Sequence, residues 1–415
     1  MRYLALLLVS ITFNIADTQA ADWPCWRGSD GLGVSPEKDL PVVWGPNKNI
    51  SWKLEVPGKG ASSPIVVGER VYLTTQTDDN GLHVLCCTRT DGRLIWDREV
   101  GRGRLHANGL HNMATPTPVS DGERVWAMFG TGDLTCLDVG GNVIWHRNLV
   151  KEYGEYKTNH GYGSSPMLDD GRLFVVCMHQ GPSYVLAIDA RTGKNIWKKD
   201  RNSGLEDEAQ DSYSSPIFVR RKNHTEVAIE GAESVSAYEP ATGSLLWSSG
   251  GLKVPHHAGR TISGPTVGDD ILIAVASGFQ NRGYMVALAP EANEAERKLW
   301  TQTKYSPDCP TPVVYGRKVF MIRDDGNASC LDLKTGEPYW QERLFSENVK
   351  VSPIVGDDKI YFLSGQGNCT VVSAAQSFQA LATNQLNQAT LSTPAISHGA
   401  LFIRTEGFLY CVAKK

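Results

Sequence analysis

The sequence predicts an all-β fold, an eight-bladed β-propeller of four-stranded antiparallel blades. One proline-led phrase recurs along the chain, each copy has room for four short strands, and a tryptophan recurs near the end of most copies. The phrase is centred on Pro64, Pro118, Pro166, Pro216, Pro265, Pro312, Pro353 and Pro394. The spacing runs from 41 residues (Pro353 to Pro394) to 54 (Pro64 to Pro118), which is typical of propeller blades.

Each copy is expected to form four strands in the same order. Proline opens a short apolar strand such as 65–67, because a missing N–H costs least at the first position of a strand. A polar turn then leads into an alternating second strand, 71–74 in the first copy. The third strand, 184–189 in the third copy, precedes Thr192-Gly193. Glycine there supplies the positive φ that a tight hairpin needs.

A tryptophan marks the outer strand of most copies. We expect its flat ring to pack against the neighbouring unit and dock blade to blade. The docking residues are Trp52, Trp96, Trp145, Trp197, Trp247, Trp300 and Trp340. The seventh copy has residues 378–381 at this place and no tryptophan, so that junction is expected to be the least regular.

The two ends of the chain are expected to share one blade. The eighth copy stops after its third strand, whereas residues 50–54 match an outer strand and precede the first copy. An N-terminal strand therefore closes the ring, which leaves no long unpaired edge at the seam.

The nine cysteines do not read as a disulfide framework, since their number is odd. Cys86, Cys136, Cys330 and Cys411 occupy one equivalent position in the third strand, which indicates a small apolar core site. Cys87 follows Cys86 directly, and a vicinal disulfide is the alternative for this pair. Alternation along a strand sends the two side chains to opposite faces, so we expect no bridge.

Residues 1–20 are predicted to be a secretory signal, with a basic start, a short apolar run and a small-residue exit ending at Ala20. The apolar run is too short for a membrane span. Asp22-Trp23-Pro24 precede Cys25 where a lipobox would have small residues, so no lipid anchor is expected. These features predict a periplasmic or secreted protein.

The mature chain is expected to be a leader followed by one domain. Residues 21–43 lack the repeat and are expected to lie across the outside of a blade, and residues 44–415 form the propeller. The net charge of −4 is spread along the chain without a basic run, which argues against nucleic acid as a partner. We expect a monomer.

The repeated phrases resemble those of the PQQ-like β-propeller repeat proteins. The similarity is carried by Ser63-Pro64-Ile65-Val66, by 187–197 with its Thr-Gly turn and Ile-Trp strand, and by Trp23 to Gly28. It covers about residues 44–415 and is specific for the fold. The resemblance implies two functions, since the superfamily includes BamB-like envelope assembly propellers and quinoprotein alcohol dehydrogenases, the latter with a vicinal disulfide against the cofactor.

A binding site is expected where the loops between successive blades gather around one mouth of the channel. The longest polar loops are 102–115, 152–163, 202–213, 251–262 and 305–308, and five of the ten histidines lie in them. The candidate ligand or partner residues are His111, Asn112, His160, Tyr162, Asp211, Tyr213, His257, Arg260, Asp308 and Lys350. No spacing rule unites the histidines, so no metal site is predicted.

The favoured function is a non-catalytic exported propeller that binds a protein, peptide or glycan partner at this mouth, in envelope assembly. No Ser-His-Asp, metal-protease or phosphate-loop motif is present. The alternative is a PQQ-dependent oxidoreductase with Ca²⁺, although no local pattern places the quinone, its cation or a carboxylate base. A third hypothesis is a structural platform that uses the sides of the blades.

Overall fold

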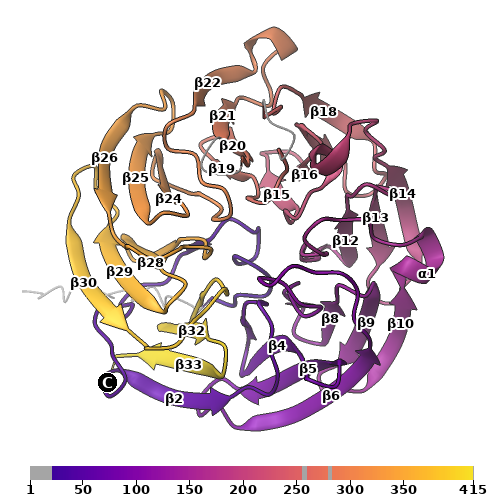
Figure 1. Ribbon diagram of the computed structural model, residues 1–415, viewed down its shortest axis with the longest axis vertical. Coiled ribbons are helices and arrows are strands. Elements are labelled where there is room, and N and C mark those ends of the chain that lie inside the picture. The colour runs from indigo at the N-terminus through magenta and orange to yellow at the C-terminus, as the bar shows by residue number, and fades with distance from the viewer. Residues whose placement is uncertain (1–20, 255–258, 279–282, 415) are drawn as a thin grey trace, which may run out of the picture.

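The computed structural model describes residues 21–254, 259–278 and 283–414 and confirms the eight-bladed propeller (Figure 1). Eight antiparallel four-stranded blades surround a central axis, and a two-residue strand, β1 (Val34–Ser35), adds to one of them. The described helices are short: α1 (Leu149–Tyr153) and the 3-10 turns η1 (Asp207–Gln210) and η3 (Glu294–Glu296).

The first four blades follow one another along the chain, each running from the inner to the outer strand. Blade 1 is β3 (Ile65–Val67), β4 (Arg70–Gln76), β5 (Gly81–Thr88) and β6 (Leu94–Arg102). Blade 2 is β7 (Val119–Ser120), β8 (Arg124–Met128), β9 (Asp133–Asp138) and β10 (Val143–Asn148). Blade 3 is β11 (Met167–Asp169), β12 (Arg172–Cys177), β13 (Tyr184–Asp189) and β14 (Asn195–Asp200). Blade 4 is β15 (Ile217–Arg220), β16 (Thr225–Gly231), β17 (Ser234–Tyr238) and β18 (Leu245–Ser249).

The remaining blades complete the ring in the same way. Blade 5 is β19 (Thr266–Gly268), β20 (Ile271–Ala276), β21 (Tyr284–Leu288) and β22 (Lys298–Gln302). Blade 6 is β23 (Val313–Tyr315), β24 (Lys318–Ile322), β25 (Asn327–Asp332) and β26 (Pro338–Arg343). Blade 7 is β27 (Ile354–Gly356), β28 (Lys359–Leu363), β29 (Asn368–Ser373) and β30 (Ala380–Gln385). Blade 8 is β31 (Ala395–Ser397), β32 (Ala400–Arg404), β33 (Phe408–Ala413) and β2 (Ile50–Glu55).

The predicted closure of the ring is confirmed. The N-terminal strand β2 pairs antiparallel with β33, and Trp52 lies opposite Cys411 in the register. The same relation holds in other blades, where Cys86 faces Trp96 and Cys136 faces Trp145. A small third-strand residue therefore lies beside each indole, as the sequence predicted. All nine cysteines lie in the described residues and are free.

Most docking tryptophans bind the Gly turn of the next blade. The indole of Trp145 donates its Nε1–H to the carbonyl of Ala190 at 3.0 Å, and the ring lies against Gly193. Trp52, Trp96, Trp197 and Trp300 repeat both contacts with the blades that follow them. Two junctions differ, since Trp247 donates to Glu226 of its own blade and Trp340 packs edge-on against Phe378.

The seventh blade has an indole after all, although its own strand provides none. In β30 the docking position is held by Ala382, opposite Val371. Trp44 of the N-terminal segment instead packs against Tyr361 at a ring distance of 6.3 Å, close to the 5.9 Å between Trp52 and Phe402 in blade 8. The backbone N–H of Trp44 donates a hydrogen bond to the Asn384 side-chain oxygen at 2.8 Å and fixes it there. The irregularity expected at blade 7 is thus compensated from outside the repeat.

The leader does not lie across the outside of a blade, as the sequence analysis expected. It crosses the end of the central channel, where the indigo segment runs through the middle of Figure 1. The inner strands are short and expose a free backbone edge to the axis, and the leader pairs with that edge in blades 1, 2, 4 and 7. These bonds join Val66 to Trp23, Ser120 to Pro24, Phe218 to Asp30 and Val355 to Gly33. Unpaired edges inside the ring, rather than exposed blade surface, determine where the leader binds.

Arg27 of the leader is almost fully buried and has no acidic partner among the described residues. Its guanidinium donates to the carbonyl oxygens of Thr311 and Pro312, each at 2.7 Å, and of Leu32 at 3.0 Å. Burial lowers the pKa of this guanidinium to about 9. Arg27 therefore links the leader to blade 6 through backbone oxygens alone.

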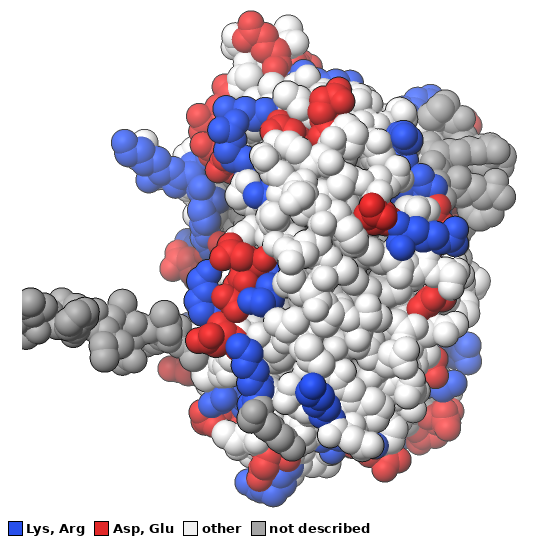
Figure 2. Space-filling model, turned by 90° about the vertical axis from the view of Figure 1, so that its left-hand side faces the viewer, with Lys and Arg blue, Asp and Glu red and all other residues white. Residues whose placement is uncertain are grey.

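The flank formed by β26 and β30 lacks charge over much of its surface. Figure 2 shows a broad uncharged band there between two charged margins. Blade 7 contributes because residues 360–403 contain no Asp, Glu, Lys or Arg. This flank is the surface to which the third hypothesis, binding through blade sides, applies most directly.

The glycine beneath each docking indole gives a stability prediction. Gly193 has φ +73° and a Cβ added to it would lie 2.8 Å from the Trp145 ring, whereas Gly171 in the same blade has φ +71° and open space around it. Both Gly→Ala variants strain the backbone, but only Gly193→Ala also displaces the indole. We expect Gly193→Ala to lower the free energy of unfolding by about 1–3 kcal/mol more than Gly171→Ala. Urea denaturation of both variants measures the difference, and equal losses would show that ring contact does not hold the blades together.

Candidate functional site

The channel forms a cavity that is closed at one end. The leader contacts the Asp357 and His398-Gly399 turns, where the first strands of blades 7 and 8 end, so it lies opposite the loops that join the blades. A cavity of about 150 Å³ occupies the axis between them, with Trp26 of the leader, Tyr213 and Lys350 among its lining residues. Access is therefore from the loop side, which the sequence analysis identified as the mouth.

A belt of hydroxyl groups lines this cavity. The residue before each repeated proline is Ser or Thr in seven blades and Gly264 in blade 5. Five backbone amides donate to the corresponding hydroxyl of the next blade at 2.8–3.0 Å: Ser63 to Thr117, Thr117 to Ser165, Ser165 to Ser215, Gly264 to Thr311 and Thr311 to Ser352. The repeated phrase thus connects neighbouring blades at the axis.

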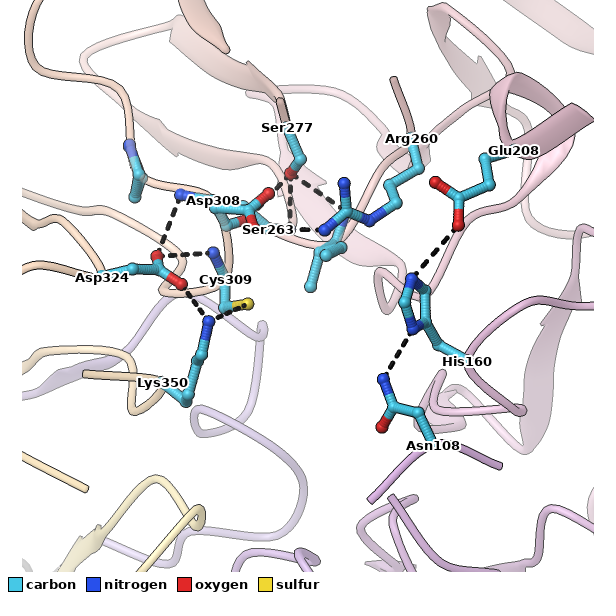
Figure 3. Close-up of polar contacts among 12 residues, drawn as sticks. Asn108, His160, Glu208, Arg260, Ser263, Ser277, Asp308, Cys309, Asp324 and Lys350 are labelled. Atoms are coloured by element: carbon cyan, nitrogen blue, oxygen red, sulfur yellow. Dashed lines mark hydrogen bonds and ion pairs between the residues drawn. The ribbon is translucent and has the colours of Figure 1, made fainter. Parts of the chain in front are cut away.

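Above the belt, basic and acidic groups from three blades form pairs at the mouth (Figure 3). Arg260 binds Asp308 at 3.2 Å, and the Lys350 ammonium binds the Asp324 carboxylate and lies 3.4 Å from the Cys309 sulfur. The other Asp324 oxygen accepts from the backbone amides of Asp308 and Cys309. These contacts hold the 308–309 loop to the β24–β25 turn.

Burial shifts the ionisation of this cluster. It raises the pKa of Asp308 to about 6, against the opposing effect of Arg260. It also raises the pKa of the Cys309 thiol. Burial alone would lower the pKa of Lys350, but Cys309 and Asp324 beside it raise it above the ordinary value. Lys350 is therefore a fixed cation, whereas Asp308 titrates near neutrality.

Histidine and tyrosine rings form the opposite wall. Asn108 Nδ2 lies 2.6 Å from His160 Nδ1, and His160 Nε2 lies 3.2 Å from Glu208. Tyr213 packs edge-on against His160 at 5.7 Å and lies 6.2 Å from His111. Burial lowers the pKa of His111 to about 4, and burial with Arg260 lowers that of His160. Both imidazoles are neutral at pH 7.

Asp211 supports this wall from below. It is fully buried, and one carboxylate oxygen accepts from the Tyr213 hydroxyl at 3.0 Å, from the Asn159 amide and from Gln180. The other oxygen has no hydrogen-bond partner among the described residues. Burial raises the pKa of Asp211 to about 6.

Six of the predicted site residues come together around the mouth: His111, His160, Tyr213, Arg260, Asp308 and Lys350. Asn112 lies beside them and donates to the Lys59 carbonyl. Tyr162 points into the core and donates to Val176, and Asp211 is buried under Tyr213. His257 lies outside the described residues.

Sequence reasoning missed five residues of the site: Trp26, Asn108, Glu208, Cys309 and Asp324. Asn108, Glu208 and Cys309 lie in or beside loops that were already singled out. Asp324 lies in a turn between second and third strands, and such turns open at the same end as the loops. Nothing in the sequence pattern placed Trp26 in the channel.

Comparison with known proteins now adds to the geometry. The family model described as outer membrane protein assembly factor BamB matches residues 34–158 and 88–342, which together are more than half of the chain. The chain belongs to this BamB family.

Individual BamB proteins are distant relatives. The BamB of Burkholderia pseudomallei (strain K96243) is 26% identical over 296 residues, 68% of this chain and 66% of that protein. Tetrathionate hydrolase of Acidithiobacillus ferrooxidans is 24% identical over 337 residues, 79% of this chain and 62% of the relative. The chain therefore spans less than two thirds of the length of these relatives.

Solved structures support the fold alone. BamB from Moraxella catarrhalis has a TM-score of 0.63 at 13% identity, covering 88% of this chain and 96% of that one. Europium-containing methanol dehydrogenase has a TM-score of 0.70 at 10% identity, covering 93% and 90%. The propeller is thus common to a BamB protein and to a methanol dehydrogenase.

Among the described residues, the groups that could hold the cation of a quinone site are already engaged. The three groups close enough to hold a metal ion, Asp308, Cys309 and Asp324, already surround the Lys350 ammonium. A divalent cation would have to displace this ammonium. Cys86 and Cys87 are buried in β5 in two different core clusters and present no disulfide to the channel.

The buried Asp211 gives a pH prediction. Its pKa rises from 3.8 to about 6 on folding, so between these pH values the folded state keeps a proton that the unfolded state has lost. Stability therefore falls as pH rises from about 4 to 6, by up to about 3 kcal/mol for this group. The Asp211→Asn variant is expected to lack this part of the fall in the free energy of unfolding, measured by urea denaturation between pH 4 and 7. The exposed Asp78→Asn variant is the control, and parallel pH curves for Asp211→Asn and the parent protein would contradict the assignment.

Proposed function

We propose that this protein is an exported, non-catalytic scaffold of cell-envelope assembly that binds a protein partner at its loop-rich mouth. Membership of the BamB family supports the assembly role, and the relatives that carry this name include those of Burkholderia pseudomallei and Moranella endobia. The chain acts as a monomeric binding module in this proposal. Its rigid ring holds the loops, and the loops make the contact.

The observation that carries the proposal is the anatomy of the mouth. Exposed leucines lie there: Leu110 and Leu391 line the cavity and Leu105 lies in the 102–115 loop, each more than one third exposed. The charged groups between them are paired with one another, as in Arg260–Asp308 and Lys350–Asp324. Exposed apolar anchors beside satisfied polar groups are typical of protein interfaces.

The same mouth lacks an activated nucleophile. Burial raises the pKa of Cys309, which keeps the thiol protonated and weakens it as a nucleophile. His160 is held between Asn108 and Glu208 and does not contact that sulfur through any described hydrogen bond. These features favour binding over covalent catalysis.

The cellular location follows from the signal at residues 1–20 in this proposal. The protein would enter the periplasm, where partners in outer-membrane assembly are available. Among the residues that the structure describes, no helix is long and apolar enough to cross a membrane. The Asp22-Trp23-Pro24 stretch before Cys25 leads us to propose that the chain is not lipidated there.

A photo-crosslinking experiment tests where the partner binds. A photoreactive amino acid replaces Leu110 at the mouth, Leu381 on the uncharged flank or Leu245 on a different flank, all of them exposed. After irradiation of intact host cells, we expect covalent capture of an envelope protein from position 110 only. Mass spectrometry then identifies the captured protein.

The three positions serve as controls for one another, because each side chain is exposed and none belongs to the core. Capture from position 381 alone would replace the mouth by the blade side as the binding surface. Equal capture from all three positions would indicate contact without specificity and would contradict the proposal.

The quinone-dependent alternative has its own test. The polyvinylalcohol dehydrogenase of a Pseudomonas species is 22% identical over 54% of this chain, so alcohol oxidation is the alternative reaction to test. Because Lys350 occupies the acidic cluster, we expect no saturable binding of PQQ with Ca²⁺ and no dye reduction with alcohols. In the Lys350→Met variant the ammonium no longer occupies the acidic cluster. Ca²⁺ binding by this variant is compared with that by the parent protein. Tight PQQ binding with turnover by the parent protein would establish the oxidoreductase instead.

A further inference from the structure

We propose that the closed-ended axial cavity binds one neutral sugar residue, either a free monosaccharide or the end of a glycan. The proposal goes beyond the protein-binding role. Leu110 and Leu391 belong to both the mouth and the cavity wall, but the test below changes only hydroxyls inside the channel, so its failure is distinct from failure of the protein-binding role. The proposal rests on the dimensions of the cavity, its hydroxyl lining, its aromatic floor and its charge balance.

The dimensions admit one small ring. The cavity has a volume of about 150 Å³, below the roughly 300–1,000 Å³ of sites for drug-sized ligands. Trp26 closes it from the leader side, while Leu110, Ile262 and Leu391 give it apolar walls. A ligand enters from the mouth and cannot pass through the ring.

The hydroxyl belt offers several hydrogen bonds to such a ligand. Seven hydroxyls line the cavity: Ser63, Thr117, Ser165, Ser215, Thr311, Ser352 and Thr393. Five of them accept a backbone N–H of the preceding blade, and none of the seven donates a hydrogen bond to any described residue. Each keeps a donor and at least one acceptor lone pair free. Groups that can donate and accept suit the hydroxyls of a sugar, which also do both.

The floor suits the apolar face of a sugar ring. The indole of Trp26 is partly exposed and lines the cavity, and the Arg27 guanidinium lies 5.7 Å from the centre of its ring. Arg27 is held by four carbonyl oxygens, so the indole rests on a fixed support. A flat aromatic surface ringed by hydroxyls matches a molecule with C–H groups on its face and O–H groups on its edge.

The charge balance favours a neutral ligand. Lys350 lines the cavity and Arg260 lies at the mouth, and Asp324 and Asp308 neutralise them. Glu208 adds a negative charge beside His160. Arg27 lies beneath the indole of Trp26, and its N–H groups donate to backbone carbonyl oxygens. An anionic ligand would therefore meet only cations that are paired or already hydrogen-bonded, whereas a neutral polyol can use the belt without disturbing these contacts.

Saturation-transfer NMR on the full mature chain tests the proposal. The probes are glucose, N-acetylglucosamine and a β-linked disaccharide of each, with glycine and acetate as small non-sugar controls. We expect transfer to at least one sugar and none to the controls, together with quenching of tryptophan fluorescence. Tighter binding of the disaccharide would identify a glycan end as the source, and equal binding would identify the free sugar.

The matched variant is Ser63→Ala with Thr393→Val. The two hydroxyls make no hydrogen bond to a described residue, so their loss is not expected to change the melting temperature. Losing two ligand hydrogen bonds is expected to weaken sugar binding about tenfold. The control is Ser249→Ala, outside the channel on β18. Absence of transfer from every sugar overturns the proposal, and so does sugar binding that Ser63→Ala/Thr393→Val leaves unchanged.

Discussion

The contact between an outer-strand indole and the turn of the next blade is the interaction on which this ring depends. A blade alone exposes two apolar faces, and the indole covers one of them while its N–H satisfies a backbone carbonyl of the neighbour. The close approach requires glycine in the turn and a small residue beside the ring in the third strand. One aromatic residue per blade therefore constrains two other positions, which explains why glycine recurs in the turn and cysteine or alanine in the third strand.

Much of the fold could be predicted because these requirements recur at every blade. The prolines marked all eight units and the tryptophans marked seven of them, and the separate strand at 50–54 showed how the ring closes. The leader could not be placed in this way, because its position depends on inner backbone edges that no side-chain pattern records. Trp44 shows the same limit, since its neighbour Tyr361 is more than three hundred residues away along the chain.

The candidate site was predictable only in outline. Loop length and polarity pointed to the correct end of the channel, and six of the predicted residues lie together there. Which side chains pair depends on distances across the axis between blades, as for Lys350 with Asp324 and Arg260 with Asp308. Tyr162 was predicted to face the mouth because it is a polar residue in a loop. Its ring instead packs inward and its hydroxyl donates to a backbone carbonyl of the core, which the sequence pattern does not record.

The path of the leader also has a consequence for how the molecule is made. A ribosome synthesises residues 21–44 before the blades, yet their partners include Thr311, Val355, Tyr361 and Asn384, which emerge hundreds of residues later. The leader can pair with the first blades early, but its contacts are complete only when the last blades have been made. A nascent or truncated chain would thus lack part of the contacts that hold the leader in the channel. Insertion of the leader marks the completed ring and distinguishes a finished molecule from a partial one.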